Sequence, residues 1–161
     1  MNLDPKEQVM DAELRFIGRI NTPYKTLAAC PRNFSDQGPQ CTIKVDEPYA
    51  DGLLGLEPGR SILVLYWFEG VNREKLQGHA RKSGKFSGVF AMRSPARPNP
   101  IAVSAVIIEK IEGNIVYTRG LDCLDETPLL DIKPLKTGED QVAKACPPAT
   151  SPSEAIHHSE E

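Results

Sequence analysis

The sequence lacks the features that mark membrane proteins and secreted proteins. Its longest apolar run, residues 62–68, is much shorter than the roughly 20 residues that a membrane-spanning helix needs. Its first residues mix acids with scattered apolar side chains, whereas a secretory signal has a basic start and an apolar centre. We therefore expect no membrane partner and a cytoplasmic location.

Paired metal ligands and glycine-rich phosphate loops are also missing. The four cysteines form no CxxC pair: Cys30, Cys41, Cys123 and Cys146. Zinc sites use closely spaced ligands, and disulfide scaffolds are smaller and richer in cysteine, so we expect reduced thiols and no metal site. Neither GxGxxG nor GxxxxGK[ST] occurs, which disfavours a Rossmann fold and a nucleotide held at a helix start.

Short apolar segments separated by proline-rich turns are what the sequence does contain. The 161 residues suit one domain, and 14 prolines favour short strands over long helices. Strands are expected at residues 14–20, 41–45, 61–68, 86–92, 101–111 and 115–119, with one helical turn in residues 53–58. The pattern predicts an all-β or mainly β fold, a closed antiparallel β-barrel with one or two short helices, over residues 1–136. A polar tail, ordered at most in part, follows at residues 137–161.

Positive charge is concentrated in one segment of an otherwise acidic chain. Residues 72–100 hold seven basic residues and one acid, a net charge of +6, although the whole chain carries −3. Such a run is either a solvated face or a surface for an anionic partner. Three prolines in residues 95–100 stiffen the backbone around Arg93 and Arg97, an arrangement suited to a carboxylate or phosphate.

A second unusual segment is acidic. Residues 120–134, GLDCLDETPLLDIKP, crowd four carboxylates together: Asp122, Asp125, Glu126 and Asp131. Carboxylates in such a cluster bind a metal or accept hydrogen bonds from ribose hydroxyls and amino groups, and the sequence leaves both readings open.

These segments carry a resemblance to a known family. FAMRSPARPNPIAVS closely resembles the FATRSPxRPNPIGxS signature of TsaA-like proteins, and RGLDCLDETPLLDIKP resembles their GLDxxDGTPVLDIKP segment. GRINTPYK, CPRN and GLEPGRSILVLYWF occur in the order typical of the family. The resemblance to this TsaA-like or TrmO family implies an S-adenosylmethionine-dependent methyltransferase that modifies N6 of threonylcarbamoyladenosine beside the tRNA anticodon. It also implies a homodimer with its cofactor near the subunit interface.

The resemblance implies cofactor contacts wherever the motifs match. They fall on Pro31, Arg32, Asn33, Arg93, Val103, Cys123, Leu124, Asp125 and Glu126. Two positions depart from the family pattern. Glu69 and Gly70 follow the strand at residues 61–68, where the family often has a histidine, and we keep both as candidate contacts. Glu126 replaces the usual glycine of DGTP.

Catalytic and substrate roles are assigned to fewer residues. Asp125 is the candidate to position the substrate amino group and to take its proton late, although the sequence establishes no base. Candidate tRNA contacts are Arg81, Lys82, Lys85 and Arg97. Two alternatives stay open, because the body is acidic and two positions depart from the pattern. They are a non-catalytic sensor of S-adenosylmethionine or a nucleotide, and a small-molecule methyltransferase.

Overall fold

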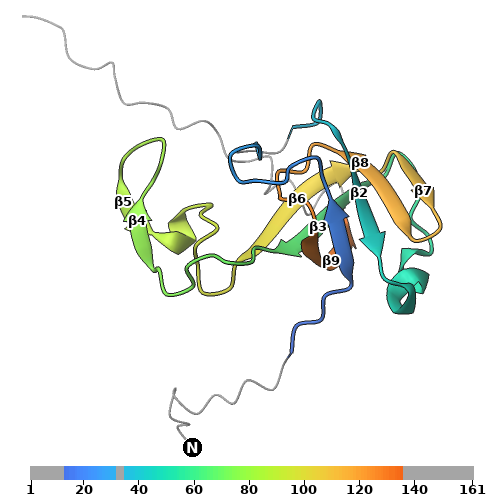
Figure 1. The fold of residues 1–161 in the computed structure, drawn as a ribbon, viewed down its shortest axis with the longest axis horizontal. Coiled ribbons are helices and arrows are strands. Elements are labelled where there is room, and N and C mark those ends of the chain that lie inside the picture. The colour runs from blue at the N-terminus through green and yellow to red at the C-terminus, as the bar shows by residue number, and fades with distance from the viewer. Residues whose placement is uncertain (1–12, 32–34, 136–161) are drawn as a thin grey trace, which may run out of the picture.

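The protein is built almost entirely from antiparallel strands. A computed structural model describes residues 13–31 and 35–135 (Figure 1). Its strands are β1 (Gly18–Asn21), β2 (Gln40–Val45), β3 (Ser61–Trp67), β4 (Gln77–His79), β5 (Phe86–Gly88), β6 (Ile101–Ile107), β7 (Lys110–Glu112), β8 (Ile115–Arg119) and β9 (Thr127–Pro134). Two short 3-10 helices are η2 (Glu47–Leu53) and η3 (Val89–Ala91). The prediction of a mainly β, antiparallel fold with few helices is confirmed.

Seven of the strands form one sheet, and β4 and β5 form a separate hairpin. The order in the sheet is β6-β3-β9-β1-β2-β8-β7, so the apolar strand β3 is interior, between β6 and β9. The end strands β6 and β7 are joined only by Ile108 and Glu109. Glu109 donates its backbone N–H to the Tyr117 carbonyl at 2.8 Å, and the Thr118 hydroxyl donates to the Ile107 carbonyl at 2.9 Å.

The two ends of the sheet therefore approach each other without a ladder of strand pairs between β6 and β8. The predicted closed barrel is not present as an unbroken ladder among the described residues. The reason is that the chain crosses from one end of the sheet to the other at Ile108 and Glu109, where β6 stops.

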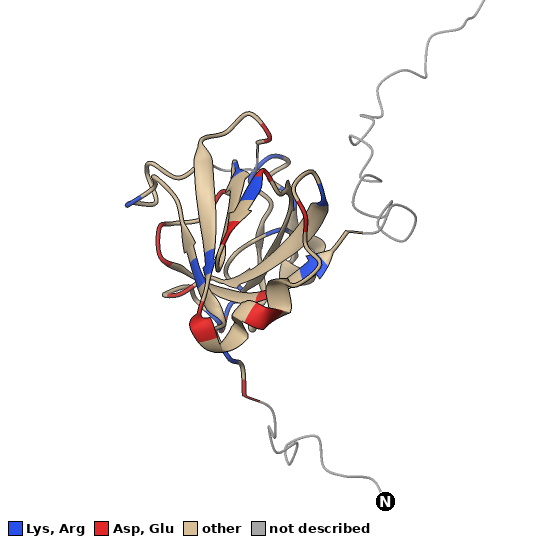
Figure 2. Cartoon of the chain, turned by 90° about the vertical axis from the view of Figure 1, so that its right-hand side faces the viewer, with Lys and Arg blue, Asp and Glu red and all other residues tan. Residues whose placement is uncertain are grey.

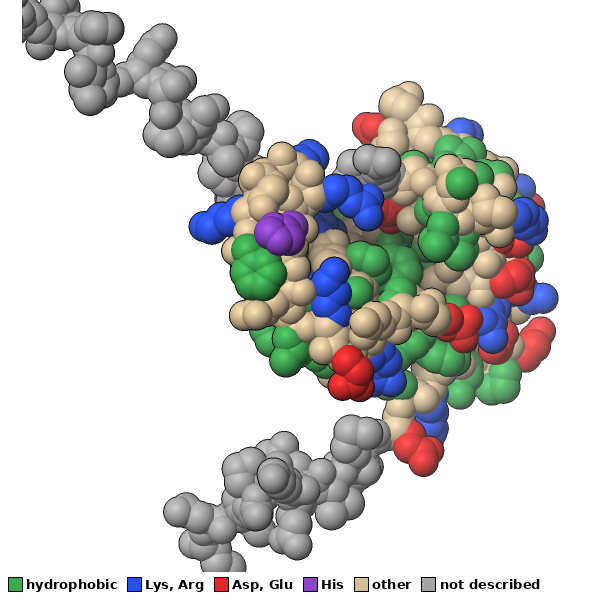
Figure 3. Space-filling view, turned by 60° about the vertical axis from the view of Figure 1, so that its left-hand side comes forward, with side chains coloured by type: hydrophobic (Ala, Val, Ile, Leu, Met, Phe, Trp, Pro, Cys, Tyr) green, Lys and Arg blue, Asp and Glu red, His purple; other side chains and the backbone are tan. Residues whose placement is uncertain are grey.

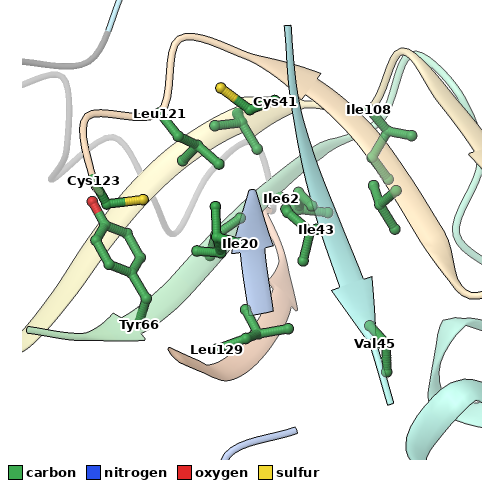
Figure 4. Close-up of a cluster of buried hydrophobic side chains, with 13 residues drawn as sticks. Ile20, Cys41, Ile43, Val45, Ile62, Tyr66, Ile108, Leu121, Cys123 and Leu129 are labelled. Atoms are coloured by element: carbon green, nitrogen blue, oxygen red, sulfur yellow. The ribbon is translucent and has the colours of Figure 1, made fainter. Parts of the chain in front are cut away.

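Alternating side chains of the curved sheet form one core. Side chains on successive strand residues point to opposite faces, so every second residue is buried. In β3 the buried residues are Ile62, Val64 and Tyr66, and in β2 they are Cys41, Ile43 and Val45. Figure 4 shows these side chains packed with others from β1, β8 and β9, and with Tyr66 and Cys123 close together.

Four predicted elements have other bounds than the sequence indicated. The strand expected at 101–111 is divided into β6 and β7 at Ile108 and Glu109. The first strand begins at Gly18 and not at residue 14, because strand pairing starts there and Leu14 is 59% exposed. The helical turn expected at 53–58 was wrong: the helix in this region is η2, which has a proline in its first turn and ends at Leu53, and residues 54–58 are not helical. The strand expected at 86–92 ends at Gly88, where η3 takes over.

Two strands were not predicted. β4 has no apolar alternation, and β9 begins inside the acidic segment at residues 120–134, where no strand was expected. None of the helices in the described ranges has the length and apolar character needed to cross a membrane. Arg32, Asn33 and the predicted tail at 137–161 lie outside the described residues.

Candidate functional site

Antiparallel pairing brings the three predicted functional segments to one end of the sheet. β1, β3 and β8 end at this edge, whereas β2, β6 and β9 begin there. The loops that follow β1, precede β6 and precede β9 therefore lie at the same end of the sheet. The first and the last of them contact each other, although they are about 100 residues apart in sequence. The three loops contain Pro31, Arg93 and residues 123–126 respectively.

A buried tyrosine ties two of these segments to the core. The Tyr66 hydroxyl lies 3.0 Å from the Ser104 hydroxyl on β6 and donates to the Asp122 carboxylate, also at 3.0 Å. Burial, reinforced by the nearby Asp122 charge, raises the pKa of Tyr66 far above its ordinary value, so the phenol stays protonated. Tyr66 therefore fixes the position of Asp122 relative to the start of β6.

Asp125 is held by the loop that follows β1. Its carboxylate forms an ion pair with Lys25 and accepts the Thr22 backbone N–H at 3.0 Å and the Asn21 side-chain amide at 3.2 Å. The Asp125 N–H in turn donates to the Tyr24 carbonyl at 2.8 Å. The Lys25 ammonium is the main cause that lowers the pKa of Asp125. A carboxylate with a lowered pKa is a weak proton acceptor at neutral pH, and its visible role is to join two loops.

The backbone of residues 122–124 is fixed by three side chains. The Thr22 hydroxyl donates to the Cys123 carbonyl at 2.9 Å, and the Thr127 hydroxyl donates to the Leu124 carbonyl at 2.7 Å. The Cys30 thiol lies 3.0 Å from the Asp122 carbonyl, which brings the loop containing Pro31 to the same place. Hydrogen bonds from three directions give this loop a single conformation.

Three of the four cysteines lie in the described residues, and all three are free thiols. Burial raises the pKa of Cys123 to about 12 and also raises the pKa values of Cys30 and Cys41. A thiol with a raised pKa is a poor nucleophile. The expectation of reduced, structural cysteines holds for these three, and Cys146 lies outside the described ranges.

Glu126 adopts a backbone conformation that explains the family's glycine. Its φ is 62°, in the left-handed region, where a side chain is strained and glycine is not. Its carboxylate accepts a hydrogen bond from Asn21, and its carbonyl accepts one from Arg19 at 3.0 Å. The side chain that the chain gained here therefore ties into the cluster around Asp125.

Two variants of Glu126 separate the cost of its left-handed backbone conformation from the contribution of its hydrogen bond with Asn21. Glu126→Ala and Glu126→Gly both lose the Asn21 contact, but only alanine keeps a Cβ at positive φ. We expect the glycine variant to be more stable than the alanine variant by about 1 kcal/mol, measured by urea unfolding. Equal stabilities, or a more stable alanine variant, would show that the left-handed conformation carries no cost here.

Arg93 reaches β6. Its guanidinium lies 3.4 Å from the Val103 carbonyl, so two residues predicted as cofactor contacts touch each other. Both side chains are exposed, and Val103 faces outward from β6 next to the inward-facing Ser104. Arg93 therefore places a positive charge at the end of the sheet where β3 ends and β6 begins.

Arg97 is engaged with its own loop. Its guanidinium donates to the carbonyls of Ser94, Val89 and Met92, at 2.7, 3.1 and 2.6 Å. Three such bonds fix the segment that carries Arg93. The structure therefore gives Arg97 a positioning role, and its predicted contact with tRNA stays a prediction.

Glu69 and Gly70 continue β3 beyond the sheet. The Phe68 N–H donates to the Pro100 carbonyl at 3.0 Å, which places the two residues beside the proline-rich loop. Gly70 has a φ of 69°, so the chain turns there.

No group of three or more His, Cys, Asp or Glu side chains suited to a metal exists in the described ranges.

The predicted tRNA contacts Arg81, Lys82 and Lys85 lie at the exposed end of the β4–β5 hairpin. Figure 3 shows a hollow between this hairpin and the sheet, with hydrophobic side chains on its floor and Lys and Arg side chains at its rim. On a different side of the molecule, Figure 2 shows acidic and basic residues intermixed, with acids on the short helix. Lys and Arg side chains therefore line part of the rim of the hollow on this face.

Comparison with known proteins assigns the chain to a family. A family model described as the tRNA-methyltransferase O N-terminal domain matches residues 19–141. This chain belongs to that family. A Rhizobium radiobacter relative named as a probable S-adenosyl-L-methionine-binding protein, VirR, is 45% identical over 77% of this chain and 71% of its own length. An Archaeoglobus fulgidus S-adenosyl-L-methionine-binding protein is 42% identical over 74% of this chain and 86% of its own length.

Longer relatives match as well. A mouse tRNA (adenine(37)-N6)-methyltransferase is 41% identical over 51% of this chain, which spans 20% of that enzyme. A solved structure of TrmO from Pseudomonas aeruginosa superimposes with a TM-score of 0.68 at 31% identity, covering 84% of this chain and 61% of the other. The family's antiparallel fold is therefore shared, although the chain spans under two thirds of that solved chain.

Several residues that hold Asp122 and Asp125 at this end of the sheet were missed at the sequence level. Tyr66, Asn21 and Lys25 hold Asp122 and Asp125, and none was selected as a site residue. Asn21 and Lys25 stand in the GRINTPYK motif, which was a usable signal. A tyrosine in an otherwise apolar strand was another, because a buried phenol needs a polar partner.

Proposed function

We propose that this protein transfers a methyl group from S-adenosylmethionine to N6 of an adenosine in tRNA, and that the adenosine carries a threonylcarbamoyl group beside the anticodon. The observation that carries the proposal is that the CPR and LDE segments contact each other through Cys30 and Asp122 at the end of the sheet where β6 begins and Arg93 lies. Membership of the tRNA-methyltransferase O family and the activity for which the mouse relative is named support it.

The groups at this end of the sheet fit the cofactor. S-adenosylmethionine presents a carboxylate, an ammonium, a sulfonium and a ribose, and so needs one cation and several acceptors. Arg93 supplies the cation, and Asp122, Glu69 and Glu126 supply carboxylates. We place the cofactor among these groups, with Pro31, Arg32, Asn33, Gly70, Val103 and residues 123–125 as its further contacts.

The bound cofactor would supply an electrophilic methyl group for an in-line displacement. The protein's own task is then to hold the substrate amino group in line and to exclude water. Asp125 serves this as a positioning residue, because its lowered pKa and its ion pair with Lys25 suit it to holding a loop. Arg97 positions Arg93 by fixing the intervening backbone.

Incorporation of radiolabelled methyl groups into bulk tRNA tests the proposal. The full-length protein should transfer label from S-adenosylmethionine to tRNA, and S-adenosylhomocysteine should inhibit the transfer. A protein that binds the cofactor but transfers no label would instead be a sensor. The Archaeoglobus fulgidus relative is named only for cofactor binding, so a sensor is the second function that this experiment tests.

We further propose that the protein forms a homodimer through the outer face of β6. This strand ends the sheet and exposes apolar side chains at Ile101 (40%), Val103 (43%) and Ile107 (57%). Apolar side chains that are gathered on one face mark an interaction surface, and a two-fold axis would place the same strand of both copies together. Because Val103 also touches Arg93, the cofactor would lie near this interface.

A single charge should break this dimer. Ile107→Glu places a carboxylate in the apolar face, and we expect light scattering to show the mass falling from dimer to monomer at micromolar concentration. Leu54→Glu is the control, because Leu54 is 95% exposed and follows η2, outside β6. A wild-type protein that is already monomeric would rule the dimer out.

A further inference from the structure

The β4–β5 hairpin stands apart from the main sheet. Its strands pair only with each other in the described structure, through Gln77 with Gly88, Gly78 with Ser87 and His79 with Phe86. Figure 1 shows it projecting from the sheet on the same side as the proline-rich loop. An isolated two-stranded hairpin gains little stability by itself, so its exposed surface is a natural place to look for a partner.

One face of the hairpin presents an exposed aromatic pair. His79 and Phe86 are opposite each other across the two strands, with ring centroids 5.1 Å apart and planes at 61°. The His79 ring nitrogen Nδ1 lies 2.9 Å from the Gly84 carbonyl, which holds the imidazole in place. Phe86 is nevertheless 56% exposed, so a fixed aromatic surface faces solvent.

Cations flank this aromatic pair and acids are absent. Residues 77–90 contain Arg81, Lys82 and Lys85 and no Asp or Glu, and all three cations are exposed. Exposed aromatic rings beside positive charges are typical of sites that bind single-stranded nucleic acid, because bases stack on the rings and the cations neutralise phosphates. Two copies of this hairpin packed against each other around a two-fold axis would place like charges together, which favours RNA over a second copy.

We propose that the β4–β5 hairpin is an RNA-binding arm. Phe86 and His79 stack on unpaired bases next to the target adenosine, and Arg81, Lys82 and Lys85 contact the neighbouring phosphates. This inference rests on the proposed tRNA substrate and extends it, because it assigns the base contacts to two aromatic residues outside the cofactor site.

Binding of a short fluorescein-labelled single-stranded RNA, followed by anisotropy on the full chain, tests the arm. Phe86→Leu keeps an apolar side chain but removes the flat ring, and should weaken binding about tenfold. Phe86→Trp should bind like the wild type. Phe90→Leu is the matched control, because Phe90 is 83% exposed but lies on η3, outside the aromatic pair.

The salt dependence of RNA binding separates the contribution of base stacking from that of the phosphate contacts. Changing both Lys82 and Lys85 to glutamine should flatten the log-log salt slope by about 1.4, since each phosphate contact on a single strand contributes about 0.7. Phe86→Leu should leave the slope unchanged. Cofactor affinity, measured by calorimetry, should stay the same in every hairpin variant.

Other outcomes distinguish the arm from the proposed activity. If the wild type methylates tRNA but Phe86→Leu binds RNA as well as the wild type does, the arm is wrong and the activity stands. If Phe86→Leu weakens RNA binding but the wild type transfers no methyl group, the arm stands and the activity is wrong. A change of molecular mass in Phe86→Leu, with RNA affinity intact, would identify the hairpin as a subunit contact and overturn the proposal.

Discussion

Replacing Gly120 by alanine should lower the free energy of unfolding by about 3 kcal/mol or more. Gly120 joins β8 to the loop that carries Asp122 and Asp125, and its φ is 73°. Its N–H donates to the Pro39 carbonyl at 3.0 Å, and its carbonyl accepts the Ser35 N–H at 3.3 Å. A Cβ on Gly120 would overlap the Ser35 carbonyl oxygen, so either the loop before β2 or the site loop has to move.

Gly113→Ala provides the control for Gly120→Ala. Gly113 also has a positive φ, 57°, but a Cβ there would meet nothing within 4 Å. We expect only the conformational cost of about 1–2 kcal/mol at Gly113, so the excess at Gly120 measures the steric overlap. Urea unfolding of the two variants gives the comparison, and equal losses would show that no close approach exists at Gly120.

Arg93→Ala should weaken S-adenosylmethionine binding roughly tenfold or more. A charge-assisted hydrogen bond to the cofactor's carboxylate is worth about 1.5–3 kcal/mol, and about 1.4 kcal/mol corresponds to a factor of ten. Arg93 is exposed and makes one long bond, to the Val103 carbonyl, so its removal should disturb the fold little. Titration calorimetry measures the affinity, and thermal unfolding without cofactor checks that the variant is folded.

Arg60→Ala is the matched control for Arg93. Arg60 is an exposed arginine that precedes β3 and so lies at the opposite end of the sheet. Its loss should leave cofactor affinity unchanged. Equal affinities for both variants, or no binding by the wild type, would remove Arg93 from the cofactor site.

The parts of the fold that follow from local pattern were predictable. β2, β3 and β8 match the expected segments closely, because alternation or an apolar run marks a buried strand. The turn before β8 contains a glycine and an asparagine in sequence, which is typical of a hairpin turn, and Gly113 has a positive φ. The family motifs also directed attention to the three segments that lie at this end of the sheet.

What could not be predicted depends on contacts between distant residues. Arg97 looked like a free anion ligand in sequence, yet three carbonyls of its own loop accept its hydrogen bonds. Asp125 was a candidate to position the substrate amino group and take its proton late, but its carboxylate is bound by partners about 100 residues away, at Asn21, Thr22 and Lys25. β9 was hidden because a strand that starts with Thr127 and Pro128 resembles a turn in sequence.

Locating a transferred methyl group tests the central claim most directly. Bulk tRNA would be incubated with the full-length protein and S-adenosylmethionine bearing a deuterated methyl group, then digested to nucleosides for mass spectrometry. We predict that the label appears on N6 of an adenine that carries a threonylcarbamoyl group. Label on another base or on ribose, or unlabelled tRNA from a protein that binds the cofactor, would contradict the account.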